Sequence, residues 1–499
     1  MDRAAMLERL SEEKEWDIVI LGGGATGLGA AVDATSRGYK TLLIEQFDFG
    51  KGTSSRSTKL VHGGVRYLEQ GNIKLVMEAL HERGYLLKNA PHLTTELPFV
   101  VPVYKWTDKF YYGIGLKMYD MLSGKLSLGK TRLLNKKETL EHLPGIDDKK
   151  LKGGILYYDG QFDDARLAIE LAITAAKYGA TILNYCEAID LLKENNKVKG
   201  VVFEDLINEI TYEVNAKVVI NATGVFTDRI IQMDEVEKEP LVEPSQGIHL
   251  VIDKKFFPGN TAMMVPKTDD KRVLFAVPWH DKVVLGTTDT PVDEISFEPK
   301  PLEEEIEFVL SHANRYLAET VTRNDVRSMF AGLRPLVRKR GTKTTAVLSR
   351  DHTIVVSKAG LVTITGGKWT TYRKMAQDAI DNAVFVAKLE RRNCVTKNLS
   401  VGNEEDAFVE DEGNNFIHAS FQYTEKDVKY FVKNEMALTV EDVLARRTRL
   451  LFLDAHAAID AAPVVARVMA SAMQKDERWI NEQIASFTEL AKQYCIDAI

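Results

Sequence analysis

Hydrophobic and polar positions near the start of the chain are spaced as in a strand–helix–strand unit. A short apolar run over residues 16–21 predicts a buried parallel strand. Small residues dominate 28–37 and predict a helix, which Gly38 ends at its C-terminus. A second apolar run, residues 41–44, predicts the next strand, and Glu45 stands at its end. This order predicts a βαβ unit.

The same reading predicts further helices and strands along the middle of the chain. Helices are predicted over 72–90 and 163–178, and strands over 154–157 and 181–183, with two alternating strands over 198–221. Short strands with tight turns, such as 279–282 and 357–360, fill 247–290 and 344–365 and suggest a mainly antiparallel sheet.

The last part of the chain predicts a separate helical module. Gly366-Gly367 opens a helix that runs to about residue 389. Residues 399–414 are polar and acidic and read as a linker, and 424–499 has a helical pattern.

Composition is ordinary for a soluble globular protein. The 499 residues are enough for two or three domains, with 27% charged and 45% apolar side chains. The formal net charge of -7 argues against a nucleic-acid binder. The three cysteines, Cys186, Cys394 and Cys495, are far apart, so we expect neither a disulfide framework nor a metal site.

We expect no secretory signal and no transmembrane helix. The first fourteen residues are charged and lack an apolar region, and no stretch approaches 18 uninterrupted apolar residues. Any work at a membrane would then be done on its surface.

A glycine motif between the first strand and helix predicts a dinucleotide site. Gly22 permits a tight turn, Gly24 lets the backbone approach a pyrophosphate, and Gly27 allows close packing of helix on strand. The helix N-terminus offers N–H groups to the phosphates, and Glu45 can bind a ribose diol. This motif alone does not separate NAD from FAD.

Eight segments together resemble the FAD-dependent glycerol-3-phosphate dehydrogenases. Residues 52–69, GTSSRSTKLVHGGVRYLE, resemble the flavin-facing loop of that family. The other segments are 162–167, 221–224, 286–289, 331–336, 349–352, 366–373 and 442–450. The resemblance covers most of the chain.

The resemblance implies an α/β fold in three parts. These are a Rossmann-like FAD-binding domain of the glycine/D-amino-acid oxidase type, an antiparallel-sheet (α+β) substrate cap and a helical C-terminal domain. The expected FAD-binding domain is discontinuous, over 15–90, 150–235 and 340–398. The expected cap takes 91–149 and 236–339, the linker 399–414 and the C-terminal domain 415–499.

The resemblance also implies the chemistry. Non-covalent FAD accepts a hydride from C2 of sn-glycerol 3-phosphate, which becomes dihydroxyacetone phosphate, and the electrons pass to a membrane quinone. The cofactor-binding residues that we expect are Gly22, Gly24, Ala25, Thr26, Gly27, Glu45, Thr53, Ser54, Ser55, Ser57, Lys59, Leu60, His62, Gly63, Gly64, Ala222, Thr223, Gly224, Gly366, Gly367 and Lys368.

A substrate phosphate needs cations, and four stand in the matching segments. The candidates for binding the phosphate are Arg66, Arg334, Arg350 and Lys368. Arg334, beside Pro335, is the strongest of them. Tyr67 either holds a substrate hydroxyl or packs as ordinary core.

The reaction also needs a base for the alcohol proton. A histidine suits this at neutral pH, and His62 in the flavin-facing loop is the first candidate. His249 is the second, and Lys368 or a bound water stays open. The predicted catalytic set is therefore His62, His249, Arg334 and Lys368.

Residues 104–132 combine aromatic, apolar and basic side chains. Six cations stand there against two aspartates, and Phe110, Ile114 and Met118 share one helical face. This suits a helix lying in an anionic membrane interface, and equally a cap helix packed on the core. Together with the quinone, it leads us to expect a cytoplasmic protein, peripheral on the inner face of the cell membrane, and possibly a homodimer.

Three other functions stay open from the sequence. The same site with oxygen as acceptor would be a glycerol-phosphate oxidase. A flavoenzyme acting on an amine or amino acid is disfavoured by the cations placed for a phosphate. A sensor or scaffold without activity would leave His62, Arg334 and Lys368 unexplained.

Overall fold

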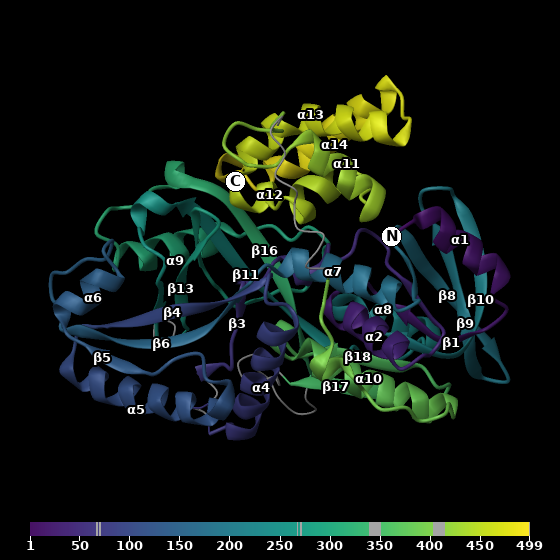
Figure 1. Cartoon of the computed structure of the whole chain (residues 1–499), viewed down its shortest axis with the longest axis horizontal. Helices are drawn as coiled ribbons and strands as arrows, with labels where there is room; N and C mark the ends of the chain where they lie inside the picture. The colour runs from purple at the N-terminus through teal and green to yellow at the C-terminus, as the bar shows by residue number, and fades with distance from the viewer. Residues whose placement is uncertain are drawn as a thin grey trace.

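Two β-sheets and a group of C-terminal helices form the computed structural model (Figure 1). It describes residues 1–65, 68, 71–266, 268–269, 272–338, 351–402 and 415–498. Among these residues, no helix has both the length and the apolar character that crossing a membrane requires.

The first sheet is built on the apolar runs predicted at the start of the chain. Its strands in chain order are β1 (Trp16–Leu21), β2 (Thr41–Ile44), β7 (Thr181–Leu183), β8 (Cys186–Glu194), β9 (Lys197–Asp205), β10 (Ile210–Asn221), β17 (His352–Val356) and β18 (Val362–Gly366). Across the sheet the order is β17-β18-β10-β1-β2-β7, and β8 and β9 extend β10. Because β18, β10, β1, β2 and β7 are parallel, their carboxyl ends meet at one edge.

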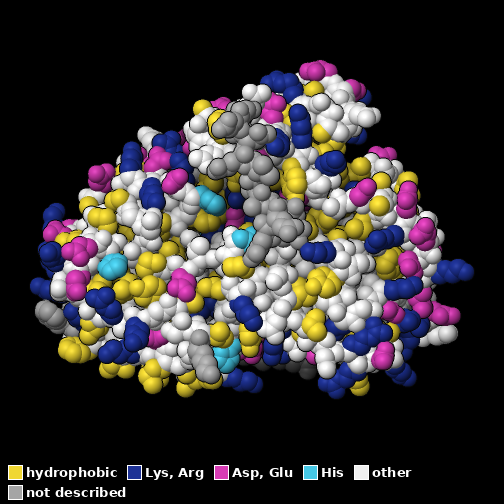
Figure 2. Space-filling view, viewed as in Figure 1, with side chains coloured by type: hydrophobic (Ala, Val, Ile, Leu, Met, Phe, Trp, Pro, Cys, Tyr) yellow, Lys and Arg dark blue, Asp and Glu magenta, His cyan; other side chains and the backbone are white. Residues whose placement is uncertain are grey.

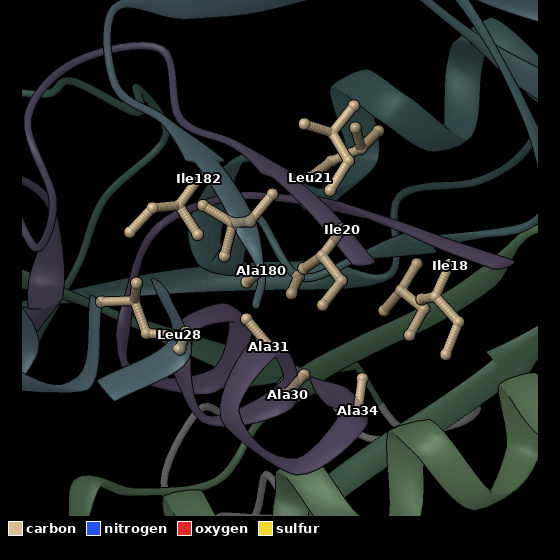
Figure 3. Close-up of a cluster of buried hydrophobic side chains, with 14 of the residues drawn as sticks. Ile18, Ile20, Leu21, Leu28, Ala30, Ala31, Ala34, Ala180 and Ile182 are labelled. Carbon is tan, nitrogen blue, oxygen red and sulfur yellow. The ribbon is translucent and has the colours of Figure 1, made fainter. Parts of the chain in front are cut away.

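Helices cover this sheet. They include α2 (Ala25–Ser36), α7 (Asp164–Lys177), α8 (Thr227–Asp234) and α10 (Tyr372–Ala387), with α1 (Arg3–Glu12) before the first strand. α4 (Ile73–Asn89) packs on the 3-10 turn Trp369–Thr371 that follows β18. The small side chains of α2 allow close packing: Ala30, Ala31 and Ala34 face Ile18 and Ile20 of β1 (Figure 3). This layer fixes the start of α2 at the carboxyl ends of the strands.

The second sheet is mostly antiparallel. Its strands are β3 (Leu60–Val61), β4 (Thr94–Val103), β5 (Arg132–Leu134), β6 (Gly153–Phe162), β11 (Val242–Asp253), β12 (Ala262–Val265), β13 (Leu274–Trp279), β14 (Lys282–Gly286), β15 (Thr290–Pro291) and β16 (Val326–Val337). The helices α5 (Trp106–Ser123), α6 (Lys136–His142) and α9 (Glu303–Asn314) belong to this part.

The C-terminal helices lie together at the top of Figure 1. They are α11 (Glu425–Asn434), a π-helical turn (Asp442–Arg447), α12 (Leu450–Leu453), α13 (Ala455–Met473) and α14 (Glu477–Lys492). We call residues 415–498 the C-terminal module. Its apolar core continues into the second sheet through Trp279 and Phe330.

Most predicted elements are confirmed, and three details are wrong. α2 begins at Ala25, because the glycine motif itself forms its first turn, and not at residue 28. β17 and β18 join the first sheet, since β18 pairs in parallel with β10, and not the antiparallel sheet. The helix after Gly366-Gly367 begins at Tyr372, behind a 3-10 turn. Several elements were not predicted, among them β4, β8, β16 and α9.

Candidate active site

The glycine motif forms the turn between β1 and α2. Gly22 has φ of +105°, and a Cβ there would lie 2.7 Å from the carbonyl oxygen of Ala222. At Gly27 a Cβ would lie 1.9 Å from the carbonyl oxygen of Gly22. Side chains at these two positions would therefore push the helix start away from the strands. Gly24 is the N-cap of α2 and brings no side chain to the helix start. The N–H of Ala25 donates to the hydroxyl of Ser54 at 2.9 Å, and the positive end of the helix dipole still favours a phosphate here.

A cavity lies where β1, β2, β10 and β18 end, and we call it the cofactor cavity. In an open parallel sheet this edge is where ligands bind. Of the residues predicted to bind the cofactor, those lining it are Gly22, Gly24, Ala25, Thr26, Glu45, Thr53, Ser54, Ala222, Thr223, Gly224, Gly366, Gly367 and Lys368.

Glu45 is fixed in place by the backbone around it. Its carboxylate accepts hydrogen bonds from the N–H of Gly23 at 2.6 Å and of Phe47 at 2.9 Å. Burial raises the pKa of Glu45, while these two hydrogen bonds oppose the rise. Its carboxylate thus stands at the end of β2, where the sequence places a ribose.

Other predicted cofactor residues lie outside the lining of that cavity. Lys59 is fully buried, with Nζ 2.8 Å from both oxygens of Asp164, and the hydroxyl of Ser57 donates to the same carboxylate at 2.7 Å. Ser55 is buried, and a Cβ at Gly63 would touch Leu80. These contacts attach the loop to α7 and α4, and a direct role with the cofactor stays a prediction.

Two more cavities continue from the first. The central cavity shares five residues with the cofactor cavity: Thr53, Pro335, Gly367, Lys368 and Trp369. The outer cavity, which Gly64 also lines, shares a set of four residues with the central one. The cofactor, central and outer cavities measure about 200, 230 and 210 Å³. The four shared residues are Thr58, Leu60, His62 and Arg334.

This continuous space fits an extended dinucleotide that carries a ring system. The phosphate end would lie at the start of α2, where the glycines leave room: the Cβ that Gly24 lacks would lie 3.2 Å from the hydroxyl of Ser54. The ring end would reach the central cavity beside Lys368 and Trp369. The residues present therefore suit FAD, as the resemblance implies.

Arg334 lies at the junction of the central and outer cavities, and its guanidinium is held on several sides. Nη1 donates to the carbonyl of Gln246 and to Asp289, both at 3.2 Å. Nη2 donates to the carbonyl of Thr288 at 2.9 Å and to the hydroxyl of Thr287 at 3.2 Å. A guanidinium fixed in this way can meet an anion without losing further side-chain entropy.

The two candidate histidines have different surroundings. His249 is 3% exposed, stacks on Phe330 at 4.9 Å, and has Nε2 at 2.9 Å from the hydroxyl of Thr58. Burial, and then the charges of Lys59 and Arg334, hold its pKa well below the usual value. His249 is therefore neutral at neutral pH.

His62 lies where the central and outer cavities meet. It lines both the central and the outer cavity, whereas His249 lines the central one. The hydroxyl of Thr370 holds its backbone, accepting from the N–H of His62 at 3.1 Å. Three predicted substrate residues, Arg66, Tyr67 and Arg350, lie outside the described residues.

Several lining residues were missed by sequence reasoning. Lys51 and Phe297 line the cofactor cavity, and Arg272 and Asp289 line the outer one. Trp369 lines two cavities and donates from Nε1 to the carbonyl of Ser54 at 2.8 Å. Asp289 and Trp369 stand in segments that carry the family resemblance, which was the available signal for them; Lys51, Arg272 and Phe297 stand outside any motif considered.

Comparisons with known proteins match both parts of the chain. A family described as "FAD dependent oxidoreductase" matches residues 17–373, and one described as "C-terminal domain of alpha-glycerophosphate oxidase" matches residues 365–479. The mitochondrial glycerol-3-phosphate dehydrogenase of Macaca fascicularis is 40% identical, covering 99% of this chain and 75% of that protein. The Homo sapiens protein of the same name is 40% identical, covering 97% and 74%.

A solved structure matches over the same length. The glycerol-3-phosphate dehydrogenase from Bacillus halodurans, complexed with FAD, has a TM-score of 0.79 and 29% sequence identity, covering 100% of this chain and 98% of that one.

Proposed function

This chain belongs to the family of FAD-dependent glycerol-3-phosphate dehydrogenases, and on that premise we propose how its residues share the work. FAD is its cofactor, and its reaction is the oxidation of sn-glycerol 3-phosphate to dihydroxyacetone phosphate. The assignment of a base and a phosphate-binding residue depends on one observation: His62 and Arg334 both line the central and the outer cavity, where these two cavities meet.

The oxidation removes a hydride and a proton from one secondary alcohol. Bound FAD supplies the acceptor for the hydride that leaves C2. The hydroxyl proton needs a base on the substrate side, and His62 takes it at a ring nitrogen, because this side chain lines both cavities where the alcohol would lie. His249 is the alternative base, neutral but held at a low pKa.

The substrate phosphate binds where cations converge. Arg334 is presented at the junction by Asp289 and two backbone carbonyls, and Lys368 lines the central cavity from the end of β18. Each charged hydrogen bond to phosphate is worth about 1.5–3 kcal/mol. Arg66, Tyr67 and Arg350 are proposed to complete this site on the evidence of their motifs.

The proposed electron acceptor is a membrane quinone, reached from the membrane surface. The support lies on α5, where Phe110, Ile114 and Met121 are 68%, 64% and 81% exposed, beside the exposed Lys117. Figure 2 shows hydrophobic side chains gathered along the lower left edge, where Figure 1 places α5. A helix packed into the core would bury this face, so the exposure favours an interfacial helix.

This surface supports a peripheral location on the inner face of the cell membrane, as the sequence led us to expect. The helix would lie in the interface with its lysines near anionic headgroups. We also propose that the protein can form a homodimer.

One matched feature favours a second acceptor. The family that matches residues 365–479 is named for an alpha-glycerophosphate oxidase, so oxygen is the alternative acceptor for the same oxidation. Rates measured with oxygen and with a soluble quinone analogue separate the two, and a faster quinone reaction is expected.

The oxidation itself is tested by anaerobic titration of the purified yellow protein. Glycerol 3-phosphate should bleach the flavin absorbance stoichiometrically, whereas glycerol and an amino acid should leave it unchanged. Persistent colour after excess glycerol 3-phosphate would contradict the proposal.

The membrane surface is tested by co-sedimentation with anionic vesicles. The variant carrying Phe110→Ser and Ile114→Ser should bind vesicles at least about tenfold more weakly, because two apolar side chains are lost from the interface. Phe385→Ser is the matched control, since Phe385 is 84% exposed on α10, away from α5. Equal binding by the double variant and the control would remove α5 from this role.

A further inference from the structure

The segment between β2 and β3 has two faces with different partners. We call residues 45–56 the clasp segment. One face lines the cofactor cavity, whereas Asp48 and Arg56 are buried and point to other parts of the chain. The residues on the cavity face are Glu45, Gln46, Gly50, Lys51, Gly52, Thr53 and Ser54.

The C-terminal module supplies the charges that meet the clasp segment. Asp48 accepts from Nε of Arg446 at 2.5 Å and also pairs with Arg447. Lys51 Nζ lies 2.7 and 2.8 Å from the two oxygens of Glu441. Arg446 in turn reaches Glu441 at 2.7 Å. Arg446 and Arg447 thus form ion pairs with Asp48, and Glu441 forms one with Lys51.

The last residue of the clasp segment, Arg56, is also held by an ion pair. Arg56 Nη2 lies 2.8 Å from an oxygen of Glu298, and the hydroxyl of Tyr494 donates to the same oxygen at 2.8 Å. The other oxygen of Glu298 lies 3.4 Å from Lys51. Tyr494 follows α14, and the centre of its ring lies 5.9 Å from the guanidinium carbon of Arg56, so a second part of the C-terminal module contacts the clasp segment.

These groups are charged and mostly buried: the side chains of Lys51 and Glu441 are 11% and 19% exposed. Burial alone would raise the pKa of Glu441, but Arg446 and Lys51 lower it to about 2. Asp48 and Arg447 are fully buried. Ion pairs of this kind fix geometry closely, because removing one partner leaves an uncompensated buried charge. Residues that line the cofactor cavity therefore depend on residues about 390 positions later in the chain.

We propose that the C-terminal module completes the FAD site, because Glu441, Arg446 and Arg447 hold the clasp segment against the cofactor and Lys51 is the positioned residue through which they act. Binding of FAD and docking of this module are then thermodynamically coupled, and each strengthens the other by the same factor. The inference rests on the cofactor and not on the identity of the substrate.

The test measures how fast FAD leaves the full-length holoenzyme after dilution, followed by the rise of flavin fluorescence. Glu441→Gln and Lys51→Met should each speed release about ten- to a hundredfold, since each breaks one charged hydrogen-bonded pair. The double variant should resemble the single ones, because both remove the same pair. Lys51→Arg should release FAD as slowly as the unaltered protein, since a guanidinium can bridge the carboxylates of Glu441 and Glu298.

Lys282→Met is the matched control. Lys282 pairs with Asp253 at 2.6 Å, and both side chains are about as buried as Lys51 and Glu441, but neither lines the cofactor cavity. FAD release from this variant should equal that of the unaltered protein. Release from Glu441→Gln within twofold of the unaltered protein would overturn the proposal, and so would equal acceleration by Lys282→Met.

A second measurement needs no variant. Hydrogen exchange of residues 442–447 in the unaltered protein should slow when FAD is added to the apoprotein, because docking and binding are coupled. If the hydrogen-exchange rate of residues 442–447 is the same with and without FAD, the proposal is overturned. A protein that keeps FAD but is not bleached by glycerol 3-phosphate would contradict the proposed function and leave this inference standing.

Discussion

The cofactor cavity and the central cavity adjoin, but different groups are expected to do the binding in each: backbone in the first and side chains in the second. Glycines and backbone groups at four strand ends line the phosphate end proposed for the cofactor cavity, as at Gly22, Gly24 and Gly366. The central cavity is formed by side chains such as His249 and Arg334, which come from two strands of the other sheet. A backbone site depends on missing side chains, whereas a side-chain site depends on distant partners that hold each group.

This difference predicts the largest effect at the glycine motif. In Gly27→Val the new Cβ would lie 1.9 Å from the carbonyl oxygen of Gly22, so α2 must move from the strands and its N-terminus from the pyrophosphate. The purified variant should carry no FAD, as measured by its visible absorbance. Gly115→Val on α5 is the control, because a Cβ there meets nothing within 4 Å. If the purified Gly27→Val protein is yellow, it still binds FAD, and the cofactor cavity does not depend on missing side chains as we argue.

The next largest effect is expected where the cavities join. His62→Gln should lower kcat by about 10²–10⁴ while FAD stays bound, because a general base is lost and the cofactor cavity is untouched. His249→Gln should cost less, since its low pKa makes it a weaker base. Stopped-flow reduction of the flavin by glycerol 3-phosphate measures both. Normal reduction in His62→Gln would transfer the role to His249.

The two regions also differ in how far the sequence predicts them. The spacing of Gly22, Gly27 and Glu45 predicts the turn, the helix start and the cavity edge, because all three lie within one βαβ unit. The parallel strand ends at Asn221 and Gly366 follow from apolar runs, although β18 was assigned to the wrong sheet. Local pattern is sufficient where backbone does the binding.

Side-chain environments were not predictable in the same way. Arg334 is held by Gln246 and Asp289, which lie 88 and 45 positions away, and Lys59 is paired with Asp164 across 105 positions. No local pattern encodes such pairings, so the sequence did not predict the pair of Lys59 with Asp164, and it missed Lys51 in the lining of the cofactor cavity. The burial of His249 likewise depends on Phe330 from the neighbouring strand.

Arg334 provides a smaller effect that sharpens the comparison. Arg334→Ala should raise the KM for glycerol 3-phosphate about 10- to 100-fold, because one charged contact to the phosphate is lost. FAD content and the flavin spectrum should stay unchanged. Arg327→Ala on the same strand is the control, since Arg327 pairs with Asp253 at the surface. An unchanged KM in Arg334→Ala would exclude it as the phosphate anchor.

The smallest effect concerns stability against pH and tests the burial of His249. Its folded pKa is depressed by burial and by Lys59 and Arg334, whereas the unfolded pKa is about 6.5. Below that pH the unfolded chain binds a proton that the folded protein does not, so this histidine's contribution is present above about pH 6.5 and is lost as pH falls. The loss is at most about 1.4 kcal/mol per pH unit. Urea unfolding at fixed FAD should therefore show a shallower fall below pH 6.5 in His249→Gln than in the unaltered protein, and identical slopes would mean that His249 takes up its proton without opening the central cavity.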